Sequence, residues 1–214
     1  MTSDPYSHRK VLNIAVPMIA SNVTVPLLGL VDTAVVGHLP SPHYLAAVAV
    51  GATIFSFVFL SFNFLRMGTT GVAAQAVGHN DADAVRGVLI QAGTIALCFA
   101  TALIVVQRPI GQIAGSLIDP ADDVAAAARE YYRIRIWAAP AVLLNYALMG
   151  WFIGLQDARS PLSIMLLVNV TNIALDLLLV LGLNMDVRGV ALASALAEWS
   201  GLALGLWLTR RTLL

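Results

Sequence analysis

Residues 161–183 read PLSIMLLVNVTNIALDLLLVLGL, an apolar stretch interrupted by only a few polar side chains. A transmembrane helix needs about 20 mostly apolar residues, so this stretch is long enough to cross a bilayer. Similar stretches recur along the 214-residue chain, and strand-like alternation is absent. We therefore predict an all-α membrane protein with one domain, residues 1–214. Its six transmembrane helices are expected at roughly 11–36, 44–65, 88–106, 136–155, 161–183 and 189–208.

The composition excludes several classes of protein. Hydrophobic residues make up 59% of the chain and charged residues 11%, whereas soluble domains carry about 25% charged residues. Lysine and arginine number 12 and are balanced by 12 acidic residues, so no excess of positive charge points to nucleic acid. The sequence also lacks the HExxH, GxSxG and Walker motifs. We expect a transporter that needs no cofactor, and neither an enzyme nor a nucleic-acid-binding protein.

Loop charges predict the orientation in the membrane. Arg9 and Lys10 precede the first predicted helix, whereas residues 37–43 carry no lysine or arginine. The positive-inside rule then places both termini in the cytoplasm of a multi-pass protein. Residues 107–135 would lie outside, and acids at Asp122 followed by alanines predict a helix there. Three tryptophans near predicted helix ends are expected to anchor the interfaces, namely Trp137, Trp151 and Trp207.

Three ionisable side chains lie inside predicted helices: Asp32, Asp176 and Glu198. Such groups are costly in a bilayer and are functional candidates by default. Asp32 and Asp176 would both lie about 6–12 Å below the outer edge at 1.5 Å per residue. A desolvated carboxylate at that depth suits reversible protonation. For each aspartate the alternative is a buried side chain that is hydrogen-bonded to the backbone at a break in its helix. Glu198 is either a second proton site or a buried side chain held by Ser194 or Trp199.

Asp176 belongs to a polar stripe. Asn169, Asn172 and Asp176 are spaced i, i+3, i+7 and fall on one helical face. Their oxygen atoms suit a hard cation such as Na⁺, and the alternative is a hydrogen-bonded seam between helices. Pro17 and Pro26 interrupt the first predicted helix, where they predict a hinge.

Five segments resemble the multidrug and toxic compound extrusion (MATE) family, and within it the DinF-like branch. They are AVPMIASNVTVPLLGLVDTAVVGH at 15–38, LRMGTTGVAAQA at 65–76, GWFIGLQ at 150–156, NVTNIALD at 169–176 and VRGVALASA at 187–195. The resemblance implies a secondary exporter in the bacterial inner membrane. Such an exporter expels organic cations and other drugs in exchange for H⁺ or Na⁺.

The resemblance also implies roles for single residues. The cation site of the family's N-terminal lobe is matched by Asp32, Asp176 and Asn172. If the coupling ion is Na⁺, all three side chains would bind it. Pro17 matches a proline at which the first helix bends. Ser194 falls where the family has a small hydroxyl residue, and Asn145 is the candidate for a conserved helix 4 asparagine.

Family members have twelve helices in two lobes, so this chain resembles the N-terminal lobe alone, and its partner would be a second six-helix lobe. Two other functions stay open: a non-transporting lobe or half-subunit, and a flippase for lipids or polysaccharide-linked lipids. A third, an intramembrane aspartyl hydrolase, is disfavoured because neither aspartate lies in a Tyr-Asp or Gly-x-Gly-Asp setting.

Overall fold

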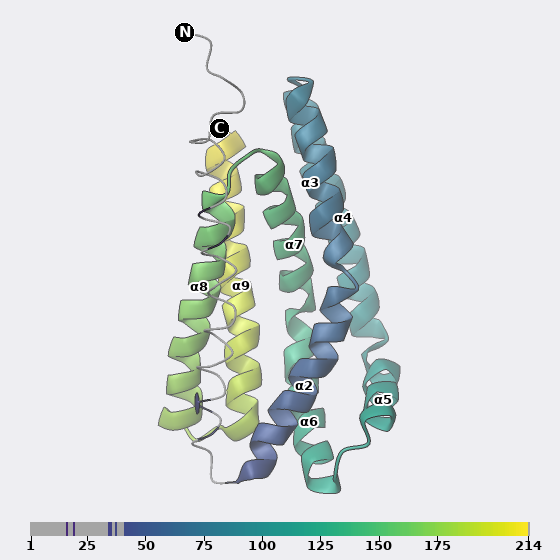
Figure 1. The fold of residues 1–214 in the computed structure, drawn as a ribbon, viewed down its shortest axis with the longest axis vertical. Helices are drawn as coiled ribbons and strands as arrows, with labels where there is room; N and C mark the ends of the chain where they lie inside the picture. The colour runs from purple at the N-terminus through teal and green to yellow at the C-terminus, as the bar shows by residue number, and fades with distance from the viewer. Residues whose placement is uncertain (1–15, 17–18, 20–33, 36, 38–40, 214) are drawn as a thin grey trace.

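The structure is a computed structural model that describes residues 16, 19, 34, 35, 37 and 41–213. Its long helices run up and down a single elongated bundle (Figure 1). No strand occurs in the part of the chain so described, as the all-α prediction requires. The elements are α2 (Pro42–Leu60), α3 (Asn63–Gly78), α4 (Ala82–Val105), α5 (Gln107–Ile118), α6 (Asp122–Arg135), the 3₁₀ turn η1 (Ile136–Ala138), α7 (Ala139–Gly154), α8 (Arg159–Asp176), the π-helix η2 (Leu177–Gly182) and α9 (Asp186–Leu213).

Five of the described segments are long and apolar enough to cross a membrane: Pro42–Gly78, Ala82–Val105, Asp122–Gly154, Arg159–Gly182 and Asp186–Thr212. The sixth predicted span, 11–36, lies almost entirely outside the described residues. The turn between α3 and α4 and the C-terminus lie at one end of the bundle, the α3–α4 end (Figure 1). The start of α2 and the loop between α5 and α6 lie at the other, the α5–α6 end.

Polar residues lie in the turns between successive helices. Asn80, Asp119, Gln156 and Asn184 all adopt positive φ, between 44° and 62°, at the points where one helix gives way to the next. Short polar side chains tolerate this left-handed conformation better than bulky apolar ones. Helix α4, which follows Asn80, is capped: Asp81 accepts a hydrogen bond from the amide of Ala84 at 2.8 Å. This cap satisfies an amide that a helix start leaves without an intrahelical partner.

Helix α7 is the centre of the bundle and contacts α3, α4, α8 and α9. Its approach to α3 is close because Gly150 faces the backbone carbonyl of Arg66, where a methyl group would overlap. Trp151 is fully buried on this helix, and its indole N–H donates to the carbonyl of Val85 at 2.9 Å. The prediction that Trp151 anchors a membrane interface was wrong, because the end of α7 packs inside the bundle.

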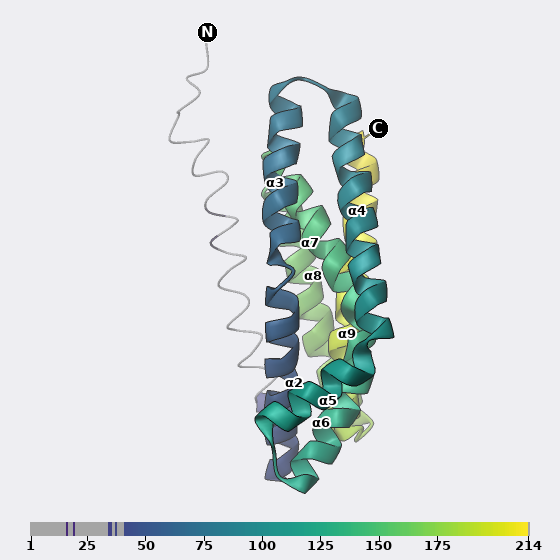
Figure 2. The same cartoon turned by 90° about the vertical axis from the view of Figure 1, so that its right-hand side faces the viewer.

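The predicted helix at 44–65 differs from the structure. A turn at Ser61–Phe62 separates α2 from α3, and α3 continues to Gly78. Arg66, the residue that follows the predicted span, lies near the start of α3. The segment 107–135 forms two helices, and α6 begins at Asp122 as predicted. Helix α5 lies across the bundle axis, whereas α6 continues through η1 into α7 (Figure 2).

Candidate functional site

A cavity of about 500 Å³ lies within the bundle, between α2, α6, α7, α8 and α9. We call it the bundle cavity. Four aromatic side chains contribute to its wall: Phe55, Phe59, Tyr131 and Tyr146. The polar side chains that line it are Ser56, Arg135, Asn172, Ser194 and Glu198. The wall thus combines aromatic rings with one arginine and one glutamate, and the face of an aromatic ring attracts positive charge.

Asp176 is completely buried next to this cavity, one helical turn beyond Asn172. It is the last residue of α8, and the π-helix η2 begins at the next residue. A π-helical turn widens the backbone locally, and such turns are frequent at functional sites. The chain thus buries a carboxylate where its helix departs from regular α geometry.

The predicted polar stripe on α8 faces the interior. Asn169 is 9% exposed and Asn172 is 2% exposed, whereas Val170 on the opposite side of the helix is 62% exposed. The amide of Asn172 donates a hydrogen bond to the hydroxyl of Ser194 on α9 at 3.3 Å. The two predicted site residues Asn172 and Ser194 are therefore in direct contact, although they come from different helices.

A second polar group joins α6, α7 and α9. The Nδ2 atom of Asn145 donates to the Oε2 atom and to the backbone carbonyl of Glu198, each at 3.1 Å. An Nη atom of Arg135 lies 3.6 Å from the Oε1 atom of Glu198. The Arg135 guanidinium also lies 5.8 Å from the ring centres of Phe55 and Phe59. Glu198 is thus held by Asn145 and Arg135, whereas one of the two alternatives from the sequence had Ser194 or Trp199 as its partner.

Sequence reasoning found only Asn172, Ser194 and Glu198 among the residues of the cavity wall, and it missed Tyr131, Arg135 and Tyr146. Arg135 was counted among the charges of an outside loop, but its side chain is only 12% exposed. The sequence does carry a signal for two of these residues: Tyr131 and Arg135 are spaced i, i+4 and therefore share a face of α6. Asp32, Pro17 and Pro26 lie outside the described residues, so the predicted acid and hinge of the first helix stay predictions.

A sequence model of the family described as MatE matches residues 17–178. The chain belongs to the MatE family. This confirms the resemblance seen in the sequence, and the family's members are transporters rather than enzymes. The chain is 45% identical over 207 residues to "DNA damage-inducible protein F" of Escherichia coli (strain K12), which covers 97% of this chain and 45% of the relative. It is 25% identical over 202 residues to "Probable multidrug resistance protein NorM" of Thermotoga maritima, covering 92% of this chain and 43% of that protein.

Solved structures of MATE proteins have the same fold as this chain. A MATE protein in complex with MaD3S superposes with a TM-score of 0.86 at 23% identity, over 95% of this chain and 46% of that one. An outward-facing multidrug resistance MATE family transporter gives a TM-score of 0.85 at 24% identity, over 95% of this chain and 45% of that one. The chain therefore has the fold of one lobe and spans about half the length of the relatives that it matches.

Proposed function

We propose that this chain forms the N-terminal lobe of a secondary active multidrug exporter in the bacterial inner membrane. The exporter exchanges organic cations and other drugs for H⁺ or Na⁺. The observation that carries the proposal is the bundle cavity, whose wall combines aromatic rings with Glu198 and which adjoins the fully buried Asp176. Relatives named for multidrug resistance, such as the Thermotoga maritima protein, support the substrate class.

In this proposal Asp176 and Asp32 carry the coupling ion. Ionisable side chains buried inside membrane helices are typical of ion and proton pathways. Asn172 and Asn169 supply further oxygen atoms on the same buried face for Na⁺. Loading and release of the ion would shift the first helix, with its prolines Pro17 and Pro26, between two shapes.

Export needs a second lobe, because one lobe provides only half of a cleft between lobes. We propose that the second lobe is supplied by a further six-helix segment or by another chain, and that both termini of this lobe face the cytoplasm. Alternating access would then follow from movement of one lobe against the other.

Neutralising the coupling acids tests the proposal. In a transporter that contains this lobe, we expect Asp176→Asn and Asp32→Asn each to abolish drug-driven proton or Na⁺ flux in everted vesicles. Asp157→Asn is the matched control, because it also removes a carboxylate but outside the bundle cavity. Asp157 caps α8 through the amides of Arg159 and Ser160, and asparagine caps a helix about equally well. Unchanged coupled flux in the Asp176→Asn protein would refute the proposal.

A second candidate function is a lobe that transports nothing by itself and associates with another membrane protein. It rests on the fold, because the chain superposes on 46% of the MATE protein in complex with MaD3S, which is one lobe. Vesicles that contain this chain together with any chain that co-purifies with it would separate the two functions. Coupled drug export that Asp176→Asn abolishes would exclude a passive lobe, and assembly without coupled export would support one.

A further inference from the structure

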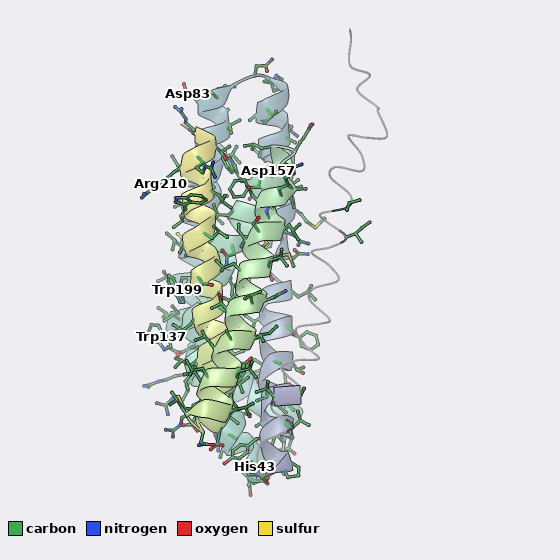
Figure 3. The ribbon with its side chains drawn as sticks, turned by 90° about the vertical axis from the view of Figure 1, so that its left-hand side faces the viewer. His43, Asp83, Trp137, Asp157, Trp199 and Arg210 are labelled. Atoms are coloured by element: carbon green, nitrogen blue, oxygen red, sulfur yellow. The ribbon has the colours of Figure 1, made fainter. Side chains whose placement is uncertain are left out.

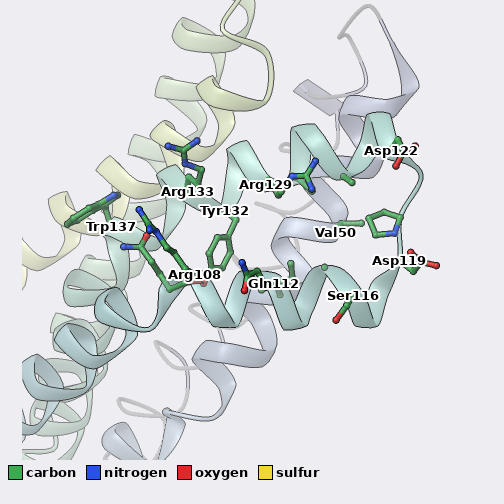
Figure 4. A pocket seen from close by; sticks show the side chains of 17 residues that line it. Val50, Arg108, Gln112, Ser116, Asp119, Asp122, Arg129, Tyr132, Arg133 and Trp137 are labelled. Atoms are coloured by element: carbon green, nitrogen blue, oxygen red, sulfur yellow. The ribbon is translucent and has the colours of Figure 1, made fainter.

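A second cavity, of about 810 Å³, lies at the α5–α6 end, away from the bundle cavity. We call it the arginine cavity. Its walls come from α5, α6, the loop between them and two residues of α2 (Figure 4). Tyr132 fixes the two helices together: its hydroxyl donates to the carbonyl of Gln107 at 3.0 Å, and its ring packs against Gly111. The cavity is therefore a built feature of the fold and not a gap between independent segments.

Helix α5 has one polar and one apolar face. Arg108, Gln112 and Ser116 are spaced four residues apart and line the arginine cavity. Ile113 and Leu117 lie on the other face and are 60% and 80% exposed. A helix of this kind that lies across the bundle axis, as α5 does in Figure 2, is typical of the membrane interface.

The position of the arginine cavity along the bundle axis also agrees with the membrane interface. From Ile136 to Gly154 the chain rises about 28 Å at 1.5 Å per residue, which is close to the thickness of the hydrocarbon core, about 30 Å. A span made of these residues alone would place α6 in the headgroup region, with Trp137, which lines the cavity and is 57% exposed, at the boundary.

Three arginines line the cavity: Arg108, Arg129 and Arg133. Arg108 and Arg133 lie at the end near Trp137, and Asp119 and Asp122 lie at the opposite end (Figure 4). The ion pairs found in the described part of the chain are Arg86–Asp83, Arg135–Glu198 and Arg188–Glu130, so none of the three arginines has a carboxylate partner there. The cavity thus carries three arginines and two aspartates, and Arg108 and Arg133 lie at the end away from the aspartates.

We propose that the arginine cavity binds the negatively charged headgroup of a phospholipid. Its phosphate would bind between Arg108, Arg129 and Arg133, because guanidinium groups form paired hydrogen bonds with phosphate oxygens. The acyl chains would lie along the exposed apolar face of α5 at Ile113 and Leu117. An anionic lipid supplies both the charge and the apolar surface that this region leaves uncovered.

Lipid binding to the purified chain tests the proposal. Native mass spectrometry compares phosphatidylglycerol with phosphatidylcholine of identical acyl chains, so that only the headgroup charge differs. We expect preferential retention of phosphatidylglycerol, with a loss of about fivefold for each of Arg108→Gln, Arg129→Gln and Arg133→Gln. Arg210→Gln is the matched control, because it removes the same charge at the α3–α4 end (Figure 3).

Further variants separate a lipid from a free anion. The triple arginine-to-lysine protein keeps the charge and should keep most of the preference, which guards against a loss caused by misfolding. Leu117→Gln should weaken retention of both lipids, and millimolar inorganic phosphate should not displace phosphatidylglycerol. Equal retention of the two lipids by the unaltered chain, a preference that survives the triple glutamine variant, or displacement by inorganic phosphate would each overturn the proposal.

Discussion

Glu198 and Arg135 form an ion pair inside the bundle, and each depends on the other for its charge to be stable there. Their side chains are 22% and 12% exposed. Glu198→Gln leaves the guanidinium without a counter-charge and should lower the free energy of unfolding by about 3 kcal/mol. The double variant Arg135→Met with Glu198→Gln should recover most of that loss. Unfolding by SDS in mixed micelles measures both values.

The chain offers a control for this pair. Glu130 and Arg188 also form an ion pair, but their side chains are 41% and 62% exposed. Glu130→Gln should therefore change the free energy of unfolding by no more than about 1 kcal/mol. Losses of equal size for Glu130→Gln and Glu198→Gln would show that burial does not strengthen the inner pair.

The sequence predicted site residues where a polar side chain interrupts an apolar run. Asn172, Asp176 and Glu198 stood out for that reason, and Asn145 and Ser194 stood out through the resemblance to the family. The structure gathers all five in or beside the bundle cavity. Arg135 did not stand out, because its neighbours in the chain are charged and read as a loop. Its burial follows from the packing of α6 against α2 and α9, which local sequence does not encode.

Among the elements, α7 depends on glycines for its contact with α3. A methyl group at Gly150 would overlap the Arg66 carbonyl, and one at Gly154 would lie 2.8 Å from the Thr70 carbonyl. Backbone atoms cannot move aside as a side chain can, so Gly150→Ala should cost about 2 kcal/mol of unfolding free energy. Gly87→Ala on α4 meets nothing within 4 Å and should be neutral or slightly stabilising. Thermal melts in detergent compare the two proteins; a neutral Gly150→Ala would contradict the close approach.

Helix existence was easier to predict than helix bounds. Hydropathy located the apolar cores of the spans, such as 161–183, because burial in lipid demands apolar side chains over a whole helix. It missed the turn at Ser61–Phe62, where Phe62 adopts φ −98° and ψ 6°, and it missed the π-helix after Asp176. Both breaks lie inside apolar runs, where hydropathy carries no information about backbone geometry.

The whole molecule has the fold of one MATE lobe, and its relatives are about twice as long. We propose that this lobe works against a second one. The most direct measurement is the native mass of the particle that contains this chain, extracted from its own membranes in mild detergent and captured with an antibody to residues 1–10. We predict a protein mass of about twice 22.7 kDa, whether from one polypeptide or from two. A particle of 22.7 kDa alone would contradict the account.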